Sequence, residues 1–311
     1  MSTYLKNVAL VGASGNLGSK VLSALLRQDK HAITVITRPN SSAKFPASVK
    51  VHKAEYRDAG SLESAFKGQD IVVLMLAFAG IADETKIIEA AARAGVKWVI
   101  PSQYGAPQTP SMVDAVPLLK GKIILNQKIV SLGMKYVGVV TNCWIDYSIQ
   151  HGVFGIDVAA RKATLYMDSV SFNTTSSAQI GAGIASFLAL PTDVIEKQFA
   201  NGSLYLSSFS LTQPQVFEAM LRVTGTTEKD WEVERKTCQD RLDVGRKKLE
   251  AGDVSGTFDL LYSMTYLEGD YSSRLHNELL GLGQEDLDEV VEEAVKAASP
   301  GPWSVGLTLA Y

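Results

Sequence analysis

The stretch VALVGASGNLGSKVLSALL, residues 8–26, places three glycines between an apolar run and a helical pattern. Gly12, Gly15 and Gly18 directly follow the apolar run, and apolar residues at helical spacing begin after them. A strand, a G-x-x-G-x-x-G turn and a helix are typical of dinucleotide binding, because the glycines permit a tight turn, close approach of a pyrophosphate and close helix packing. The phosphates then lie at the positive helix N-terminus. A tight turn without a ligand is the alternative for an isolated glycine triplet.

The first half of the chain alternates between two patterns. The strand candidates are 5–11, 32–38, 49–54, 71–76, 96–101 and 135–140. The helix candidates are 19–28, 61–68, 83–95 and 119–133. Since the strands are almost continuously apolar, they are expected to be parallel and covered on both faces. This alternation predicts an α/β fold with a doubly wound parallel (Rossmann) sheet.

The alternation ends near residue 150. We expect a dinucleotide-binding domain over 1–152, with 174–192 packing back on it, and a smaller, irregular α+β substrate lobe over 153–311. The highly charged stretch 227–252 predicts a solvated helix. The apolar residues 300–311 are expected to dock on the body of the protein.

Composition limits the classes of function. Hydrophobic residues make up 46% and charged residues 20% of the chain, and the net charge is −3 without a basic cluster, which excludes a nucleic-acid footprint. Cys143 and Cys238 supply neither a disulfide framework nor a metal site. The longest apolar run, 71–82, is too short to span a membrane. We therefore expect a cytoplasmic monomer or homodimer that acts on a small molecule.

The end of the second strand selects the cofactor. An NAD site usually has an acidic residue there, whereas this chain has Arg38. A guanidinium suits the 2′-phosphate of NADPH, and Lys44 adds a second positive charge nearby. An exposed surface arginine is the alternative. The sequence predicts NADPH.

One common catalytic arrangement is absent from the sequence. The main type of short-chain dehydrogenase needs a lysine four residues after a tyrosine, because it then lies beside the phenol and lowers its pKa. No tyrosine in this chain has a lysine at that distance. A different proton donor is therefore expected.

Four short motifs carry a family resemblance. They are GASGNLG (12–18), TRP (37–39), PSQYG (101–105) and TNCW (141–144). Together they resemble the isoflavone reductase and phenylcoumaran benzylic ether reductase group, within the NmrA-like family of atypical short-chain dehydrogenases. The resemblance covers residues 6–147. It implies hydride transfer from NADPH to a conjugated or benzylic aromatic compound, with Lys122, eleven residues before Gly133, as general acid/base.

The residues around Lys122 give it modest independent support. It lies in the apolar stretch LLKGKIIL, where burial lowers the pKa of an ammonium towards the working range. Lys120 and Lys128 are equally available in the sequence, and a lysine often extends from a helix to solvent. The plant reductases usually carry an arginine one turn after this lysine. Asn126 stands there instead, which puts the plant-type substrate contacts in question.

The remaining site predictions follow strand ends, where open α/β sheets bind ligands. The predicted cofactor-binding residues are Gly12, Ala13, Ser14, Gly15, Asn16, Leu17, Gly18, Arg38, Lys44, Ala77, Phe78, Ser102, Gln103, Tyr104, Lys122, Asn142 and Cys143. The predicted substrate contacts are Tyr104, Trp144, Tyr147, His151 and Phe154. Cys143 as a small buried filler is the alternative at that position.

Three functions stay open at this point. The first is an NADPH-dependent reductase that uses Lys122. The second is an NADP(H)-binding redox sensor that acts through a protein partner without chemistry. The third is an epimerase or lyase that keeps its nucleotide bound.

Overall fold

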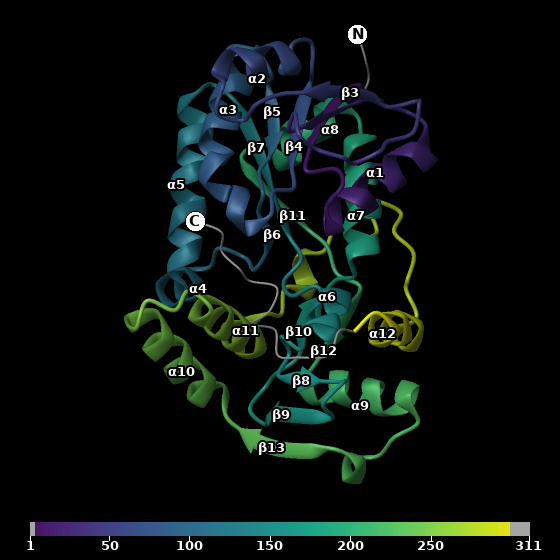
Figure 1. Cartoon of the computed structure of the whole chain (residues 1–311), viewed down its shortest axis with the longest axis vertical. Coiled ribbons are helices and arrows are strands. Elements are labelled where there is room, and N and C mark those ends of the chain that lie inside the picture. Colours follow the sequence, from purple (N-terminus) through teal and green to yellow (C-terminus); the bar gives the residue numbers. More distant parts are fainter. Residues whose placement is uncertain (1–3, 299–311) are drawn as a thin grey trace.

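The computed structural model describes residues 4–298, which form an upper lobe built on a parallel sheet and a smaller lower lobe (Figure 1). The predicted α/β fold with a parallel sheet is confirmed. In spatial order the sheet contains β11 (Gly202–Tyr205), β7 (Lys135–Val140), β5 (Trp98–Ile100), β4 (Ile71–Leu74), β1 (Asn7–Val11), β2 (Ala32–Thr37) and β3 (Lys50–Lys53). The short β6 (Tyr104–Gly105) also pairs with β7. The strand order reverses between β1 and β4.

Both faces of the sheet are covered by helices. Successive strand residues point to opposite faces, and both sets of side chains are apolar, so each face needs a cover. Leu10 packs with α1 (Asn16–Gln28) and α7 (Ser177–Leu188), and α8 (Thr192–Phe199) contributes to the same core. The adjacent Val11 packs on the other side, whose helices are α2 (Ala59–Phe66), α3 (Glu84–Arg93) and α5 (Pro117–Ser131). The six predicted strands and four predicted helices of the first half all form.

The chain returns to the sheet after its excursion into the lower lobe. β11 pairs in parallel with β7, and α7 packs along α1. A boundary at residue 152 therefore does not separate the whole sheet from the rest of the chain. The sequence predicts a strand at the start of residues 203–225, followed by a helix that starts near Pro214, but it does not show that this strand joins the parallel sheet.

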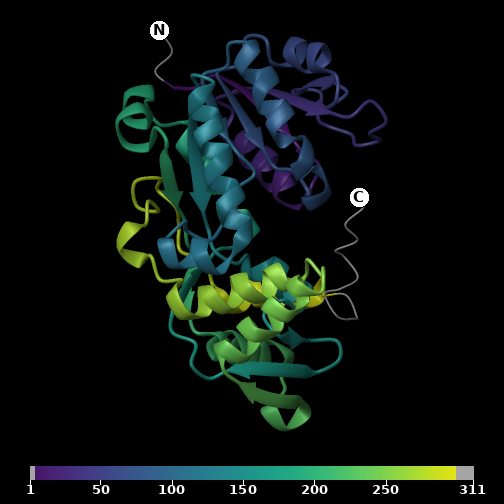
Figure 2. The same ribbon diagram turned by 90° about the vertical axis from the view of Figure 1, so that its left-hand side faces the viewer.

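The lower lobe consists of two small sheets and several helices (Figure 2). Its strands are β8 (Ile156–Asp157), β9 (Lys162–Tyr166), β10 (Phe172–Thr174), β12 (Phe209–Leu211) and β13 (Glu232–Lys236). Its helices are α6 (Ile145–Gln150), α9 (Gln213–Thr224), α10 (Cys238–Glu250), α11 (Gly256–Glu268) and α12 (Leu287–Lys296). The short helices of the chain are α4 (Pro110–Ala115), η1 (Phe78–Asp83), η2 (Glu228–Asp230) and η3 (Ser272–Arg274). Aromatic rings fill the core of this lobe, which is distinct from the two cores of the sheet.

The prediction of one helix over 227–252 is wrong in its first half. β13 pairs in parallel with β9, and its charged side chains line the exposed edge of that sheet. Trp231 packs edge-on against Phe217, which fixes the chain before the strand. A capping box at Thr237 then starts α10. The prediction for 300–311 lies outside the described residues.

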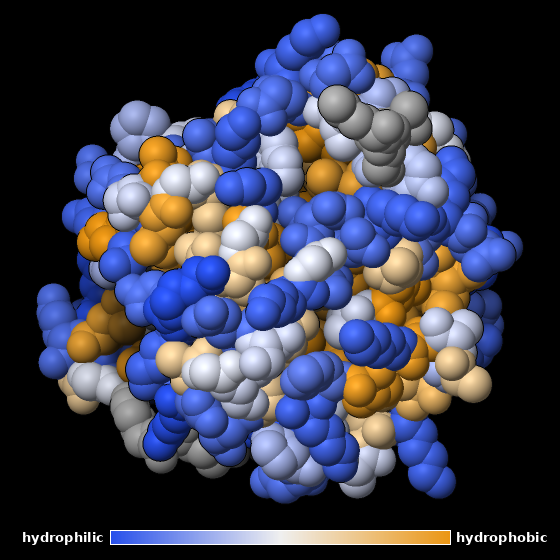
Figure 3. Space-filling model, turned by 90° about the horizontal axis from the view of Figure 1, so that it is seen from above, coloured by the Kyte–Doolittle hydropathy of each residue, from blue (hydrophilic) through white to orange (hydrophobic). Residues whose placement is uncertain are grey.

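The described helices are too short or too polar to span a membrane singly. Among the described residues no single helix is long and apolar enough to cross a bilayer, and the only pair that qualifies together, α7 and α8, bends by 113°. Both helices lie in the core of the upper lobe. The face in Figure 3 is mostly hydrophilic, with apolar residues in separate patches.

Gly18 gives a first prediction. A Cβ atom at Gly18 would lie 2.1 Å from the Gly12 carbonyl oxygen, so Gly18→Ala forces the turn and α1 apart. We expect the free energy of unfolding to fall by about 1–3 kcal/mol, as for other overpacked sites, in denaturant titrations. Gly15→Ala is the matched control, since its Cβ would lie 3.3 Å from the same oxygen. Equal losses in both variants would contradict the prediction.

Candidate functional site

The turn after β1 lies where the strand order reverses, the usual ligand position in such sheets. Gly12 has φ +85°, and a Cβ there would lie 2.2 Å from the carbonyl oxygen of Met75, which follows β4. The ends of β1 and β4 are thus in contact at Gly12, a position where only glycine fits. Ala13 and Leu17 are buried beneath the turn, whereas Ser14 and Asn16 are exposed.

The N-terminus of α1 is open to a ligand. Its N-cap is Gly15, no side chain caps it, and its first turn has no acidic residue. In α9 and α10, by contrast, threonine side chains occupy the equivalent N–H groups. An uncapped, positively polarised helix end suits a phosphate group.

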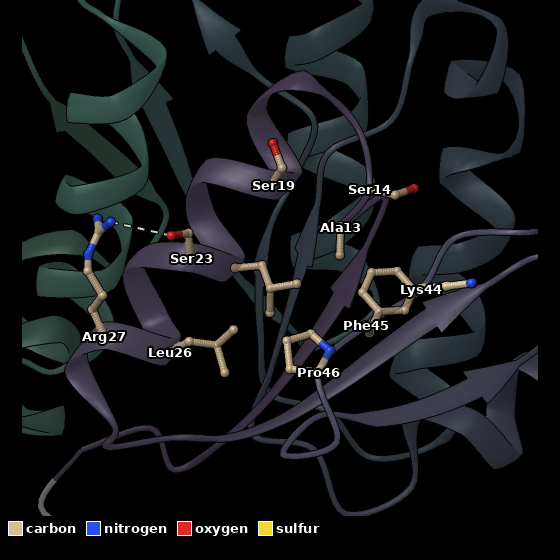
Figure 4. A pocket seen from close by; sticks show the side chains of 10 residues that line it. Ala13, Ser14, Ser19, Ser23, Leu26, Arg27, Lys44, Phe45 and Pro46 are labelled. Atoms are coloured by element: carbon tan, nitrogen blue, oxygen red, sulfur yellow. Dashed lines mark hydrogen bonds between the residues drawn. The ribbon is translucent and has the colours of Figure 1, made fainter.

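A pocket of about 590 Å³ adjoins this turn. Figure 4 shows α1 along one side and Phe45 and Pro46 across from it. Its lining residues are Ala13, Ser14, Ser19, Leu22, Ser23, Leu26, Arg27, Lys44, Phe45 and Pro46. Lys44 is therefore brought to the glycine turn, as predicted. Arg38 is exposed immediately after β2 and is not among the lining residues.

Lys122 lies on the inward face of α5. Leu119, Asn126 and Ile129 are buried on this face at helical spacing. Lys120 points to solvent, and Lys128 forms a 2.9 Å ion pair with Glu89. Desolvation lowers the pKa of Lys122 from 10.5 to about 8, and the Glu84 carboxylate opposes this shift. The fold thus distinguishes three lysines that the sequence left equivalent.

Gln103 connects α5 to the turn after β5. Its Nε2 donates to the Lys122 carbonyl oxygen at 3.3 Å and to Asn126 Oδ1 at 2.9 Å. Gln108 Nε2 donates to Gln103 Oε1 at 3.2 Å. Asn126, at the position of the plant arginine, thus holds Gln103. These side chains line an enclosed cavity of about 40 Å³, large enough for a water molecule.

Glu84 is a buried acid that the sequence analysis missed. It begins α3 and is only 4% exposed, and its Oε1 accepts a 2.6 Å hydrogen bond from the Ser102 N–H. Ser102 Oγ in turn accepts from the N–H of Leu76, so the ends of β4 and β5 are tied together. Helical spacing was the available signal, because Glu84 shares the buried face of α3 with Ile87 and Ile88.

Three of the predicted substrate contacts, Trp144, Tyr147 and His151, lie in one aromatic group, and Tyr104 is joined to it through its backbone carbonyl. Trp144 Nε1 donates to the carbonyl oxygen of Tyr104 at 3.2 Å. The rings of Trp144 and Tyr147 pack edge to face at 6.1 Å, and Tyr147 and His151 lie 4.3 Å apart. The Tyr104 hydroxyl donates to the Leu74 carbonyl oxygen at 2.9 Å and is thereby engaged with the sheet.

Other predicted residues are placed differently. Phe154 is fully buried in the aromatic core of the lower lobe, whereas the rings of Trp144, Tyr147 and His151 are partly exposed. Cys143 is buried in the same core, which raises the pKa of its thiol to about 12. Asn142 is buried with φ +50°, and its Nδ2 donates to the carbonyl oxygens of Asn173 and Gly269. The Asn142 amide thus ties the end of β7 to β10 and to the end of α11 in the lower lobe.

The remaining predicted cofactor-binding residues, Ala77 and Phe78, follow β4. Ala77 is exposed, and Phe78 begins η1. Within residues 4–298 no group of three His, Cys, Asp or Glu side chains is arranged to hold a metal ion.

Sequence comparisons extend over most of the chain. The model of the NmrA-like family matches residues 5–250. The oxidoreductase aprR of Aspergillus flavus is 27% identical over 309 residues, which cover 93% of this chain and 98% of that protein. The oxidoreductase poxI of Penicillium oxalicum is 28% identical and covers 91% of this chain and 92% of its own length. An isoflavone reductase homolog of Zea mays is 29% identical, over 48% of this chain and 52% of that protein.

Solved structures share the fold. Crystal structures of pinoresinol-lariciresinol and phenylcoumaran benzylic ether reductases include a chain that superposes with a TM-score of 0.73 at 18% identity, covering 93% of this chain and 99% of that chain. The leucoanthocyanidin reductase of Vitis vinifera, solved with NADPH, superposes with a TM-score of 0.72 at 15% identity, with the same coverage. At this identity the likeness concerns the fold alone.

Proposed function

The chain belongs to the NmrA-like family, and on that premise we propose that it is an NADPH-dependent reductase of a conjugated or benzylic aromatic small molecule. The observation that carries this proposal is the buried ammonium of Lys122 at the carboxyl edge of the sheet. A lysine whose pKa lies near 8 can donate and recover a proton at physiological pH. The names of the full-length fungal relatives, both oxidoreductases, support the reaction class.

The residues at the glycine turn fit NADPH. The uncapped N-terminus of α1 offers N–H groups for the pyrophosphate, and the exposed Arg38 and Lys44 offer positive charge for the 2′-phosphate. NADPH bound there would supply a hydride. The structures of the same fold solved with NADPH support this assignment.

Lys122 would hold the proton of the reaction. Gln103 Nε2 donates to its carbonyl oxygen, which ties the turn of α5 that carries the ammonium to the turn after β5. Trp144, Tyr147 and His151 would form an aromatic wall for the substrate, a role that fits their half-buried rings. The cytoplasmic location and the monomeric or homodimeric state stay predictions from the sequence.

The direct test is NADPH consumption with a panel of quinones, enones and benzylic phenolic ethers. Turnover of at least one acceptor is expected. Tight NADPH binding without consumption across the panel would contradict the reductase and favour the redox sensor. Nucleotide that co-purifies and never exchanges would favour the epimerase or lyase.

The coenzyme preference gives a second prediction. Arg38→Ala removes a charge-assisted contact to the 2′-phosphate, so we expect KM for NADPH to rise by about 10- to 100-fold, in line with about 1.5–3 kcal/mol for such a bond. KM for NADH should change little, because NADH lacks that phosphate. Lys50→Ala is the control, because Lys50 is an exposed charge at the start of β3, at the opposite end of the parallel strands from Arg38. An equal rise in KM for NADH would show that Arg38 does not bind the 2′-phosphate.

A further inference from the structure

Two charged side chains from different helices approach the turn of residues 102–105. Glu84, at the start of α3, is fixed on the Ser102 N–H. From the other side, the Lys122 Nζ lies 4.0 Å from where a Cβ of Gly105 would stand. The two groups thus reach the same turn, and each charge shifts the pKa of the other group towards its charged form. The carboxylate comes from α3 and the ammonium from α5, so the assembled fold is needed to bring both to this turn.

The carboxylate of Glu84 is unusual in its burial. Glu89, the other acidic residue of α3, is partly exposed and pairs with Lys128. Burial raises the pKa of the Glu84 carboxyl, whereas the Ser102 hydrogen bond and the Lys122 charge lower it. A buried carboxylate is costly unless it is compensated, so its position at the same turn as the Lys122 ammonium indicates a role.

We propose that Glu84 is a positioning residue for the reaction, its buried carboxylate serving as the fixed countercharge of the Lys122 ammonium. This inference rests on the proposed function for its catalytic consequence, but the pairing itself can be measured without turnover. Burial favours the neutral form of Lys122, and a neutral lysine cannot donate a proton. The Glu84 carboxylate opposes this effect and favours the charged form.

Other groups around Lys122 do not supply this charge. From β6, Tyr104 is kept neutral because burial raises its pKa well above the ordinary value, and its hydroxyl binds Leu74. From β7, Tyr136 lines the small cavity, and burial also raises its pKa. Asp114 of α4 is exposed, and on α5 itself Lys120 points outward. Glu84 is therefore the acid to test.

The test is the pH titration of Lys122 itself, in protein carrying [¹³Cε]lysine, with and without NADP⁺. The Lys122 signal is identified by its loss in Lys122→Met. The wild-type midpoint is expected near pH 8. In Glu84→Gln, which keeps an acceptor for Ser102, the midpoint should fall. A midpoint near pH 7 would reduce the protonated fraction at pH 8 from about one half to about one tenth.

Glu89→Gln is the matched control, because it removes an α3 carboxylate that pairs with another lysine of α5. Its Lys122 midpoint should equal that of the wild type. In an active enzyme, the pH profile of kcat/KM in Glu84→Gln should move to lower pH, with about a fivefold loss at pH 8. A merely structural glutamate would lower activity without moving the profile.

The outcomes separate the two proposals. An unchanged Lys122 midpoint in Glu84→Gln overturns the countercharge, even in an active enzyme. A wild type without turnover overturns the reductase, while a lowered midpoint still supports the countercharge. If Glu84→Gln does not fold, the reciprocal measurement decides: Lys122→Met should raise the midpoint of the Glu84 carboxyl signal, and an unchanged midpoint contradicts the pairing.

Discussion

Lys122→Met is expected to abolish turnover while making the protein more stable. Removal of a positioned acid or base costs about 10²- to 10⁴-fold in kcat, and Met keeps most of the apolar stem. NADPH should still bind within about threefold of the wild-type Kd, because the glycine turn and α1 are untouched. Steady-state kinetics and a binding titration on the same preparation measure both effects.

The stability gain follows from the pKa of Lys122. Its folded pKa is about 8, against 10.5 for an ordinary lysine, so the unfolded state binds more protons between these values. Stability therefore rises with pH across this window. Below pH 8 the folded wild type carries the full cost of the buried charge, up to about 3 kcal/mol, in which the attraction to Glu84 is already included.

Lys122→Met removes that cost. The variant should unfold at higher denaturant concentration than the wild type at pH 7, and the difference should disappear by about pH 10.5. Lys120→Met is the control, since this exposed residue of the same helix should change neither kinetics nor stability. A less stable Lys122→Met protein at pH 7 would show that the ammonium is not desolvated.

Asp259→Ala is expected to destabilise the lower lobe by about 3–5 kcal/mol, because it leaves a buried charge without compensation. Asp259 Oδ1 accepts from Arg241 Nε at 3.1 Å, and Oδ2 accepts from Lys248 at 2.7 Å. Both side chains of the Arg241 pair are almost fully buried. Arg241 also lies 5.3 Å from the rings of Tyr166 and Tyr262 and donates to the Val153 carbonyl oxygen.

Two controls test that explanation. Asp243→Ala on α10 breaks an exposed pair with Arg246 and should cost less than about 1 kcal/mol. Arg241→Met combined with Asp259→Ala should recover part of the loss, since no unpaired guanidinium remains. Denaturant unfolding followed by tryptophan fluorescence measures all three variants. A double variant as unstable as Asp259→Ala would mean that the aromatic packing of Arg241, rather than its charge, stabilises the lobe.

The sequence predicted the upper lobe well because its signals are local. Continuous apolar strands, glycine-ended helices and the glycine turn each lie within a few residues, and the family assignment that they suggested is confirmed. The strand β13, and the pairing of β11 with β7, were not predicted because the pairing partners are far away in the chain. A charged edge strand such as Glu232–Lys236 has no apolar alternation to reveal it.

The site was predictable only where a motif fixed the position. Lys122 emerged from the family resemblance, and helical geometry then distinguishes it from Lys120 and Lys128. Glu84 and Ser102 are eighteen residues apart, so no spacing rule joins them before the sheet is assembled. Phe154 was expected to contact a substrate but lies in the core, because the sequence around an aromatic residue does not show whether its ring faces a substrate or a core.

Because the chain returns to the sheet only at residues 202–205, the sheet cannot be completed when β1 to β7 have been synthesised. When the ribosome has released residues 1–152, β7 still has an open edge, and the apolar face of α1 still waits for α7. The nascent chain must keep these surfaces from other partners until residue 205 has emerged. The upper lobe is thus completed only after α6 and β8–β10 of the lower lobe have been made, whereas most of the lower lobe follows residue 205, so a single cut in the chain does not separate the two lobes.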